Sequence, residues 1–284
     1  MSLNGKEIVV TGGTDGIGKV TARELAKQGA RVTIVARNAT KGDNVVRELR
    51  AQTQSETIFF VEGDLSSRKG VNHAAGLLKE RLSKLDVLVN NAGAFFQTRT
   101  ISADGVEQTL ALNHLGYFSM TALLIDVLKA AGSARIVNVA SAAHLGAKLN
   151  LDDLQNEKRY SGWTAYGQSK LANIYFTYEL SRRLEGSTVT ANCLHPGFVA
   201  SAFGDNNGGF MRAAIGFAKS IAAISEDKGA RTSVYLASSP DVEKVNGRYF
   251  DKCKDVKSSP VSYDENISRQ LWAASESLAG LTFK

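Results

Sequence analysis

Tyr166 and Lys170 are the two residues whose types and spacing most directly suggest chemistry. They lie four positions apart in a segment with a helical pattern, so their side chains are neighbours on one helix face. A tyrosine has an ordinary pKa of ~10 and is a poor base near neutral pH. We expect the ammonium group of Lys170 to lower the pKa of Tyr166 by favouring the phenolate. The pair could then give or take a proton at a carbonyl or alcohol oxygen.

A glycine-rich turn gives a second chemical signal. It follows a short apolar run at residues 8–10, precedes a helical pattern, and has the spacing Gly-x3-Gly-x-Gly. Glycines let a backbone approach a pyrophosphate closely, and the N-terminus of the following helix offers free N–H groups. Any tight turn favours glycine, but the position between a strand and a helix favours dinucleotide binding. The expected phosphate site consists of Gly12, Thr14, Asp15, Gly16, Ile17 and Gly18.

The end of the second expected strand bears on the choice of dinucleotide. An acidic residue at this place, about 20 positions after the glycines, would bind the ribose 2′-hydroxyl of NAD. The chain has Arg37 and Asn38 there instead. A guanidinium group is a good partner for a 2′-phosphate, so the sequence predicts NADP. The alternative is an exposed arginine at a strand end that binds no ligand.

Small and polar residues follow several later expected strands, and one asparagine lies within a long helical pattern. In an open parallel sheet, ligands bind at the carboxyl ends of the strands. We therefore expect these residues to meet in one crevice with the glycine-rich turn. They are Asn91, Ala92, Gly93, Asn113, Ser141, Pro196 and Gly197.

The elements that would position these residues alternate along the chain. Nearly continuous apolar runs separated by helical patterns are typical of a parallel sheet covered on both faces. We predict a single α/β domain with a Rossmann-type, doubly wound parallel sheet of about seven strands, and a loop insertion near residues 200–225. The expected strands are 6–10, 31–36, 57–62, 86–90, 135–140, 188–194 and 247–250. The expected helices are 17–28, 40–52, 68–82, 104–131, 163–184, 226–237 and 264–278.

The joint pattern resembles the short-chain dehydrogenase/reductase superfamily over essentially the whole chain. The motifs that carry this resemblance are the glycine-rich turn, Asp64-Leu65, the Asn90–Gly93 motif, Asn113, Ser141, Tyr166-x3-Lys170 and Pro196-Gly197. Finer features are similar to the retinol dehydrogenase-like branch. They include Ala36-Arg37-Asn38, residues 169–173, residues 194–197 and the long segment between Ser141 and Tyr166.

The resemblance implies a role for each catalytic candidate. Tyr166 would be the acid/base, and Ser141 would orient the substrate oxygen. Lys170 would bind the nicotinamide ribose and lower the pKa of the tyrosine. Asn113 would hold a water molecule in a proton relay.

The resemblance also implies further cofactor contacts. Asp64 and Leu65 would contact the adenine. The stretch after Pro196, including Val199, would cover the nicotinamide carboxamide. Ser201 stands where the family favours threonine, and its hydroxyl could make the same contact.

Aromatic residues are frequent near the expected crevice and indicate a lipophilic pocket. Each of them alone is more commonly a packing residue than a ligand contact, but together they favour an apolar substrate. The candidate substrate residues are Phe95, His144, Trp163, Phe198 and Phe203.

Composition and charge exclude several classes of protein. The 284 residues carry a net charge of +6 that is spread along the chain, which gives little support for nucleic-acid binding. Two cysteines provide neither a disulfide scaffold nor a zinc-site spacing, and no metal is expected. Residues 1–6 are polar, and the most apolar stretch that we identify is 210–224. We therefore expect no signal peptide or transmembrane anchor, and a cytoplasmic location.

The sequence thus predicts an NADP(H)-dependent oxidoreductase acting on a carbonyl or alcohol, with lipophilic aldehydes or ketones, including retinal-like compounds, as the favoured substrates. The alternatives are a reductase of small polar carbonyls or of a carbon–carbon double bond, and a non-catalytic NADP(H)-binding sensor. By the same resemblance, the chain could form a homodimer or a homotetramer.

Overall fold

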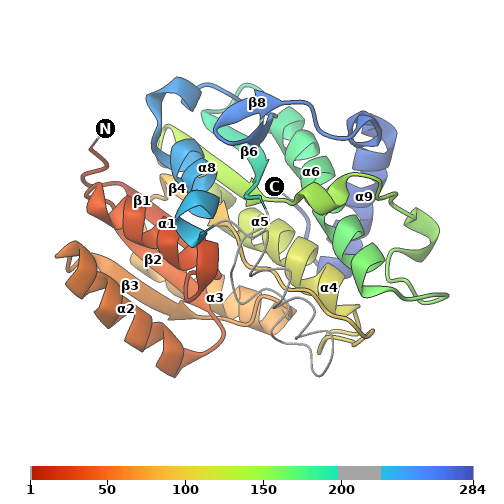
Figure 1. Ribbon diagram of the computed structural model, residues 1–284, viewed down its shortest axis with the longest axis horizontal. Coiled ribbons are helices and arrows are strands. Elements are labelled where there is room, and N and C mark those ends of the chain that lie inside the picture. Colours follow the sequence, from red (N-terminus) through yellow and green to blue (C-terminus); the bar gives the residue numbers. More distant parts are fainter. Residues whose placement is uncertain (1, 198–224, 284) are drawn as a thin grey trace.

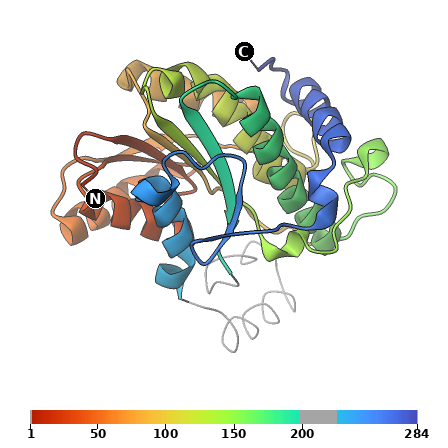
Figure 2. The same cartoon turned by 90° about the horizontal axis from the view of Figure 1, so that it is seen from above.

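The computed structural model describes residues 2–197 and 225–283, in which helices cover both faces of an eight-stranded sheet (Figures 1 and 2). The strand order is β3-β2-β1-β4-β5-β6-β7-β8, and all neighbours are parallel except the antiparallel pair β7 and β8. The strands are β1 (Glu7–Thr11), β2 (Arg31–Ala36), β3 (Ile58–Glu62), β4 (Val87–Asn90), β5 (Ala134–Val139), β6 (Val189–His195), β7 (Tyr249–Asp251) and β8 (Lys254–Val256).

The centre of the sheet explains where a ligand can bind. In β1, Ile8 pairs with Val32 of β2 on one side and with Val87 of β4 on the other. The chain therefore leaves β1 in one direction towards β2 and β3, and later returns to its other side through β4. Such a reversal opens a crevice at the carboxyl ends of the central strands.

Most helices begin at a residue whose side chain caps the free N–H groups. Asp15, Asn38, Ser67, Ser225 and Asp264 each accept a hydrogen bond from the first turn of the helix that follows them. The α-helices are α1 (Gly16–Lys27), α2 (Ala39–Thr53), α3 (Arg68–Arg81), α4 (Gln108–Leu110), α5 (Gly116–Lys129), α6 (Gly162–Arg183), α8 (Glu226–Ser238) and α9 (Glu265–Ala279).

Two hydrophobic layers fix the sheet between the helices. On one face, Leu25 of α1, Leu49 of α2 and Leu236 of α8 are buried with inward side chains of the strands. On the other face α3, α5, α6 and α9 pack together, and Phe118 of α5 and Trp272 of α9 are buried there. Helix α9 lies beside α6 in both views (Figures 1 and 2). The doubly wound α/β fold predicted from the sequence is confirmed.

The structure corrects two expected elements. Strand β8 was not predicted, because Lys254–Val256 is a short segment of exposed residues without an apolar run. The long helix predicted at residues 104–131 is shorter and contains a π-helical turn: α4 begins after Glu107, the π-turn (η1) covers Ala111–Leu115, and α5 ends at Lys129. The Glu107 carboxylate accepts the N–H groups of Thr109 and Leu110, which explains the later start.

One continuous helical stretch, Gln108–Lys129, is long and apolar enough to cross a membrane by length and composition alone. It has a mean hydropathy of 1.3, and 78% of its most apolar window is buried inside the protein. The sequence analysis identified residues 210–224 as the most apolar stretch instead, and these lie outside the described residues. A largely buried helix of this kind is also what the core of an α/β fold contains.

Candidate active site

The turn after β1 packs too closely on the loop after β4 to carry a side chain at Gly12. This residue has a φ of 66°, and a Cβ atom there would lie 2.8 Å from the Cα atom of Ala92. Asn91 secures the contact by donating a side-chain hydrogen bond of 2.9 Å to the carbonyl oxygen of Thr11. The Thr11 hydroxyl in turn accepts the backbone N–H groups of Asn91 and Ala92. The two loops therefore form one rigid floor below the N-terminus of α1.

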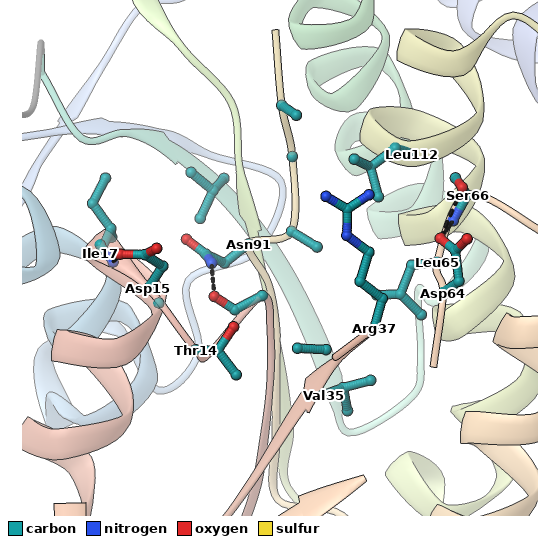
Figure 3. Close-up of a pocket in the computed structure, with 18 of the residues that line it drawn as sticks. Thr14, Asp15, Ile17, Val35, Arg37, Asp64, Leu65, Ser66, Asn91 and Leu112 are labelled. Atoms are coloured by element: carbon teal, nitrogen blue, oxygen red, sulfur yellow. Dashed lines mark hydrogen bonds between the residues drawn. The ribbon is translucent and has the colours of Figure 1, made fainter. Parts of the chain in front are cut away.

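A cavity of about 460 Å³ opens above this floor, at the carboxyl ends of the central strands. In Figure 3, Thr14, Asp15 and Ile17 lie on one side, and Asp64, Leu65 and Ser66 lie on the other. The sequence-predicted cofactor residues that line the cavity are Gly12, Thr14, Asp15, Gly16, Ile17, Gly18, Arg37, Asn38, Asp64, Leu65, Asn91, Ala92, Gly93, Tyr166, Lys170 and Pro196. The cavity thus brings together residues from five loops that are distant in the sequence.

Arg37 stands at the end of β2 with an exposed side chain, between the two sides of the cavity in Figure 3. Asn38 accepts the backbone N–H of Lys41 and so starts α2. The Lys41 ammonium group lies 2.6 Å from the Asp15 carboxylate, across the cavity from its own helix. Lys41 is a second cation at this end of the cavity, and the sequence analysis did not identify it. The signal available in the sequence was its position four residues after Arg37, at the start of the next helix.

Asp64 has a structural partner within its own loop. Its carboxylate accepts hydrogen bonds from the backbone N–H and the hydroxyl of Ser66, at 3.0 and 2.8 Å. This holds the loop between β3 and α3 so that Leu65 borders the cavity. An adenine contact by Asp64 and Leu65 remains a prediction.

Tyr166 lies in α6 and lines the cavity. Burial raises the pKa of Tyr166 to about 12, although a hydrogen bond with the Ser141 hydroxyl acts in the opposite direction. The sequence-based expectation that Lys170 lowers the pKa of Tyr166 is therefore wrong. The phenol is protonated at neutral pH and can act as a proton donor.

Lys170 is itself strongly affected by its position. Its side chain is only 3% exposed, and its ammonium group donates a hydrogen bond of 3.1 Å to the carbonyl oxygen of Val139. Burial lowers the pKa of Lys170 to about 7. Near neutral pH the amine is consequently divided between its charged and neutral forms, which explains why it does not act as a fixed positive charge beside Tyr166.

Asn113 lies in the π-helical turn η1 and is not one of the residues that line the cavity. Its side chain accepts the N–H of Ala94 at 2.9 Å and donates to the Ala94 carbonyl and to the Ser169 hydroxyl. It therefore joins the loop after β4 to the helix that carries Tyr166. A π-turn at a functional position is a recurrent feature of enzymes, and the proposed water relay through Asn113 remains a prediction.

The candidate substrate residues are placed in different surroundings. Phe95 is buried with its ring 4.7 Å from that of Trp163 and 6.1 Å from that of Tyr166, whereas Trp163 is 52% exposed. His144 is fully buried and does not line the cavity. Phe198 and Phe203 lie outside the described residues, as do the predicted cofactor contacts Val199 and Ser201. Gly197 is exposed beside the cavity, where Pro196 forms part of the wall.

Several further residues line the cavity, and some of them are apolar. Phe96 follows the candidate Phe95 directly after the Asn90–Gly93 motif, so its position in the sequence was a signal. Leu112 has no motif of its own, and only the folded arrangement of the π-turn identifies it. Val139 and Ala140 precede Ser141 at the end of β5 and could have been inferred from that position. The additional residues are Val35, Ala36, Lys41, Gly63, Ser66, Ala94, Phe96, Gln108, Leu112, Val139 and Ala140.

Comparison with known proteins identifies the family of this chain. The family model described as short chain dehydrogenase matches residues 6–209. The chain belongs to the short-chain dehydrogenase family. It is 39% identical over 284 residues to retinol dehydrogenase 12 of Mus musculus, covering 100% of this chain and 89% of that protein, which places it in the retinol dehydrogenase-like branch.

Two other similar proteins bear on the site of this short-chain dehydrogenase. Polyprenol dehydrogenase of Homo sapiens is 40% identical over 279 residues, covering 96% of this chain and 84% of that protein. A crystal structure of a short chain dehydrogenase from Burkholderia cenocepacia J2315 in complex with NADP has a TM-score of 0.69 and 27% identity, and the match covers 88% of this chain and 97% of that one.

Proposed function

We propose that this short-chain dehydrogenase uses NADP(H) to interconvert lipophilic aldehydes or ketones and the corresponding alcohols. The observation that carries the proposal is a cavity lined both by Tyr166, which is hydrogen-bonded to Ser141, and by Arg37. One cavity therefore holds a proton donor and a cation that could bind a phosphate.

The walls of the cavity fit a dinucleotide phosphate. The floor at Gly12 is bare backbone, and the N-terminus of α1 faces it, as pyrophosphate binding requires. Arg37 and Lys41 would bind the 2′-phosphate, which favours NADP over NAD. The related dehydrogenase from Burkholderia cenocepacia in complex with NADP supports this choice. When bound, the nicotinamide supplies or accepts the hydride.

The residues of the chain would provide the proton and the orientation. Tyr166, whose pKa of about 12 keeps it protonated at neutral pH, would donate to the carbonyl oxygen in the reductive direction. Ser141 would hold the same oxygen. Lys170, which borders the cavity next to Gly93, would bind the nicotinamide ribose. A hydroxyl-rich ribose at that point would replace the Val139 carbonyl as a partner of the amine.

Apolar side chains in the cavity and beside Tyr166 support a lipophilic substrate. Phe96 and Leu112 line the cavity, and the exposed Trp163 ring lies against Phe95 at the start of α6. The names of the similar proteins, a retinol dehydrogenase and a polyprenol dehydrogenase, point to the same class. Each additional buried methylene contributes roughly 0.8 kcal/mol, so kcat/KM should rise with aldehyde chain length until the pocket is full.

The test is NADPH oxidation with a series of straight-chain aldehydes, small sugars and activated alkenes, using wild-type protein and Tyr166→Phe. We expect activity that rises from short to medium-chain aldehydes, and a loss of about 10²–10⁴-fold in kcat for Tyr166→Phe with NADPH binding retained. A preference for sugars or alkenes would contradict lipophilic aldehydes and ketones as the substrate class and would indicate the preferred class instead. NADPH binding without turnover of any compound would indicate a sensor, and wild-type activity of Tyr166→Phe would refute the catalytic assignment.

Location and assembly are part of the same proposal. Cys193 and Cys253 are both free, which is compatible with a reducing, cytoplasmic compartment. Cell fractionation tests the location. We also infer a homodimer or homotetramer, which light scattering of the purified protein can distinguish from a monomer.

A further inference from the structure

His144 is held by hydrogen bonds at both ring nitrogens. It ends the 3-10 turn η2 (Ala142–His144), which directly follows Ser141, and it is only 1% exposed. Its Nδ1 atom lies 2.7 Å from the Ser141 carbonyl oxygen, and its Nε2 atom lies 3.1 Å from the backbone nitrogen of Ser259. A backbone N–H can only donate, so Nε2 accepts and Nδ1 carries the hydrogen atom. Both bonds therefore require the neutral ring in one tautomer.

The partner of His144 on the far side is fixed to the catalytic helix. Ser259 precedes the 3-10 turn η5 (Pro260–Tyr263). Tyr175 of α6 donates a hydrogen bond of 2.6 Å to the Val261 carbonyl oxygen, and the Tyr178 hydroxyl lies 2.7 Å from that of Ser258. Segment 258–263 is thereby anchored to the same helix that carries Tyr166.

The turn that contains His144 also meets α6 directly. A Cβ atom on Gly167, the residue after Tyr166, would lie 2.8 Å from the carbonyl oxygen of Ala143. The η2 turn is therefore enclosed between the backbone of α6 and segment 258–263, and His144 spans the distance between them. Burial holds the pKa of His144 below its ordinary value, which favours the neutral form that this arrangement needs.

We propose that His144 is a positioning residue that sets the place of the Ser141 hydroxyl relative to the Tyr166 phenol. It does so by tying the Ser141 carbonyl to a segment that is anchored on α6. The proposal rests on the proposed function, because it assigns the spacing of the two groups that would hold the substrate oxygen. It also gives His144 a place outside the substrate pocket.

Three substitutions separate the two hydrogen bonds of His144. In His144→Asn, the side-chain amide can reach the Nδ1 position and donate to the Ser141 carbonyl. In His144→Gln, the amide oxygen can reach the Nε2 position and accept from Ser259. His144→Phe keeps the ring and its burial but removes both bonds. Leu128→Ala, in the core at the end of α5 and remote from the cavity, is the control for a general loss of stability.

Two measurements are made on each variant. The first is kcat and KM for NADPH oxidation with a medium-chain aldehyde. The second is the ionisation of Tyr166 followed by phenolate absorbance, with Tyr166→Phe as the blank, and it requires no catalysis. The hydrogen bond from Ser141 lowers the pKa of Tyr166, so displacement of Ser141 should raise the midpoint.

For His144→Phe we expect a loss of up to about 10²-fold in kcat, as a misplacement near 1 Å can produce, with an unchanged KM for NADPH and a raised Tyr166 midpoint. His144→Asn should recover most of kcat, and His144→Gln should recover less. Leu128→Ala should keep the wild-type kcat and midpoint.

An unchanged Tyr166 midpoint and kcat in His144→Phe would overturn the proposal. If His144→Phe does not fold, equal values for the Asn and Gln variants would overturn it instead. A wild-type protein without reductase activity would refute the proposed function, and the absorbance measurement would still decide whether His144 positions Ser141.

Discussion

At the scale of single residues, Lys170 places an amine where burial works against its charge. In the folded protein the pKa of Lys170 is about 7, whereas its ordinary value is 10.5. Protonation of the amine in the folded protein buries a cation. In the unfolded chain the same cation remains in water. At neutral pH this disfavours the fold by an upper limit of about 4 kcal/mol. The buried amine therefore opposes the stability of the fold.

We therefore expect Lys170→Met to abolish turnover and to raise the midpoint of thermal unfolding. In a chain of this size the midpoint should rise by roughly 2–4 °C for each kcal/mol added to the free energy of unfolding. Calorimetry at pH 7 measures this rise. The loss of one hydrogen bond to Val139 reduces the gain but should not cancel it. A lower midpoint than that of the wild type would show that the amine stabilises the fold.

The second prediction for a single residue concerns Arg37 and the preference for NADPH over NADH. We expect wild-type protein to prefer NADPH over NADH by at least about tenfold in KM, since a charge-assisted hydrogen bond contributes about 1.5–3 kcal/mol. Arg37→Asp should narrow or reverse the preference, because the carboxylate repels a 2′-phosphate and can bind a ribose hydroxyl. Arg47→Asp, with the same change of charge on α2 but outside the cavity lining, is the matched control. Equal use of both cofactors by the wild type would contradict the assignment.

At the scale of elements, the start of α6 is fixed by a contact that leaves no room for a side chain. A Cβ atom on Gly162 would lie 2.5 Å from the Phe96 carbonyl oxygen and 3.0 Å from the Cα atom of Gln97. Tyr166 follows one helical turn later, so the same contact helps to place its side chain. The cavity wall at Phe96 and the helix that carries Tyr166 are consequently coupled.

Gly162→Ala should therefore destabilise the fold by about 1–3 kcal/mol and lower kcat, although alanine is ordinarily the better helix former. Gly76→Ala in α3 is the matched control, since a Cβ atom there meets nothing within 4 Å. That variant should be more stable than the wild type by about 0.5–1 kcal/mol, with unchanged activity. Chemical denaturation and the aldehyde assay measure both. Equal behaviour of the two variants would contradict this account of the helix start.

The sequence predicted those elements whose signals are local. Buried runs such as Val87–Asn90 and the glycine-rich turn after β1 have patterns that depend on neighbouring residues only. Strand β8 depends on pairing with β7, and the π-turn at Asn113 depends on packing against α6, so neither has a local pattern. The raised pKa of Tyr166 likewise reflects burial by distant segments, which the spacing to Lys170 could not indicate.

At the scale of the whole molecule, buried histidines make the fold sensitive to acid. Burial lowers the pKa of His114 to about 4, and it also lowers the pKa values of His144 and His195. Below pH 6.5 these histidines become protonated in the unfolded chain but stay neutral in the folded protein. The free energy of unfolding therefore falls as the pH drops towards 4. His114 alone accounts for an upper limit of about 3 kcal/mol over this range.

We expect the midpoint of thermal unfolding to fall progressively between pH 6.5 and 4 in the wild type, and to fall less steeply in His114→Gln. Glutamine is chosen because its amide can keep one of the two hydrogen bonds that His114 makes with Asn173 and Ser275. Scanning calorimetry across this range provides the comparison. Parallel curves for the two proteins would exclude His114 as a source of the acid sensitivity.

The packing of α9 against α6 has a consequence for synthesis on the ribosome. The Phe176 and Trp272 rings of these helices stack at 5.8 Å, yet α9 begins at Glu265, 82 residues after α6 ends at Arg183. At roughly 5–20 residues per second, translation leaves that face of α6 uncovered for about 4–16 s. During this interval the nascent chain presents apolar side chains to the cell, so a growing polypeptide of this dehydrogenase should be a chaperone client until α9 emerges.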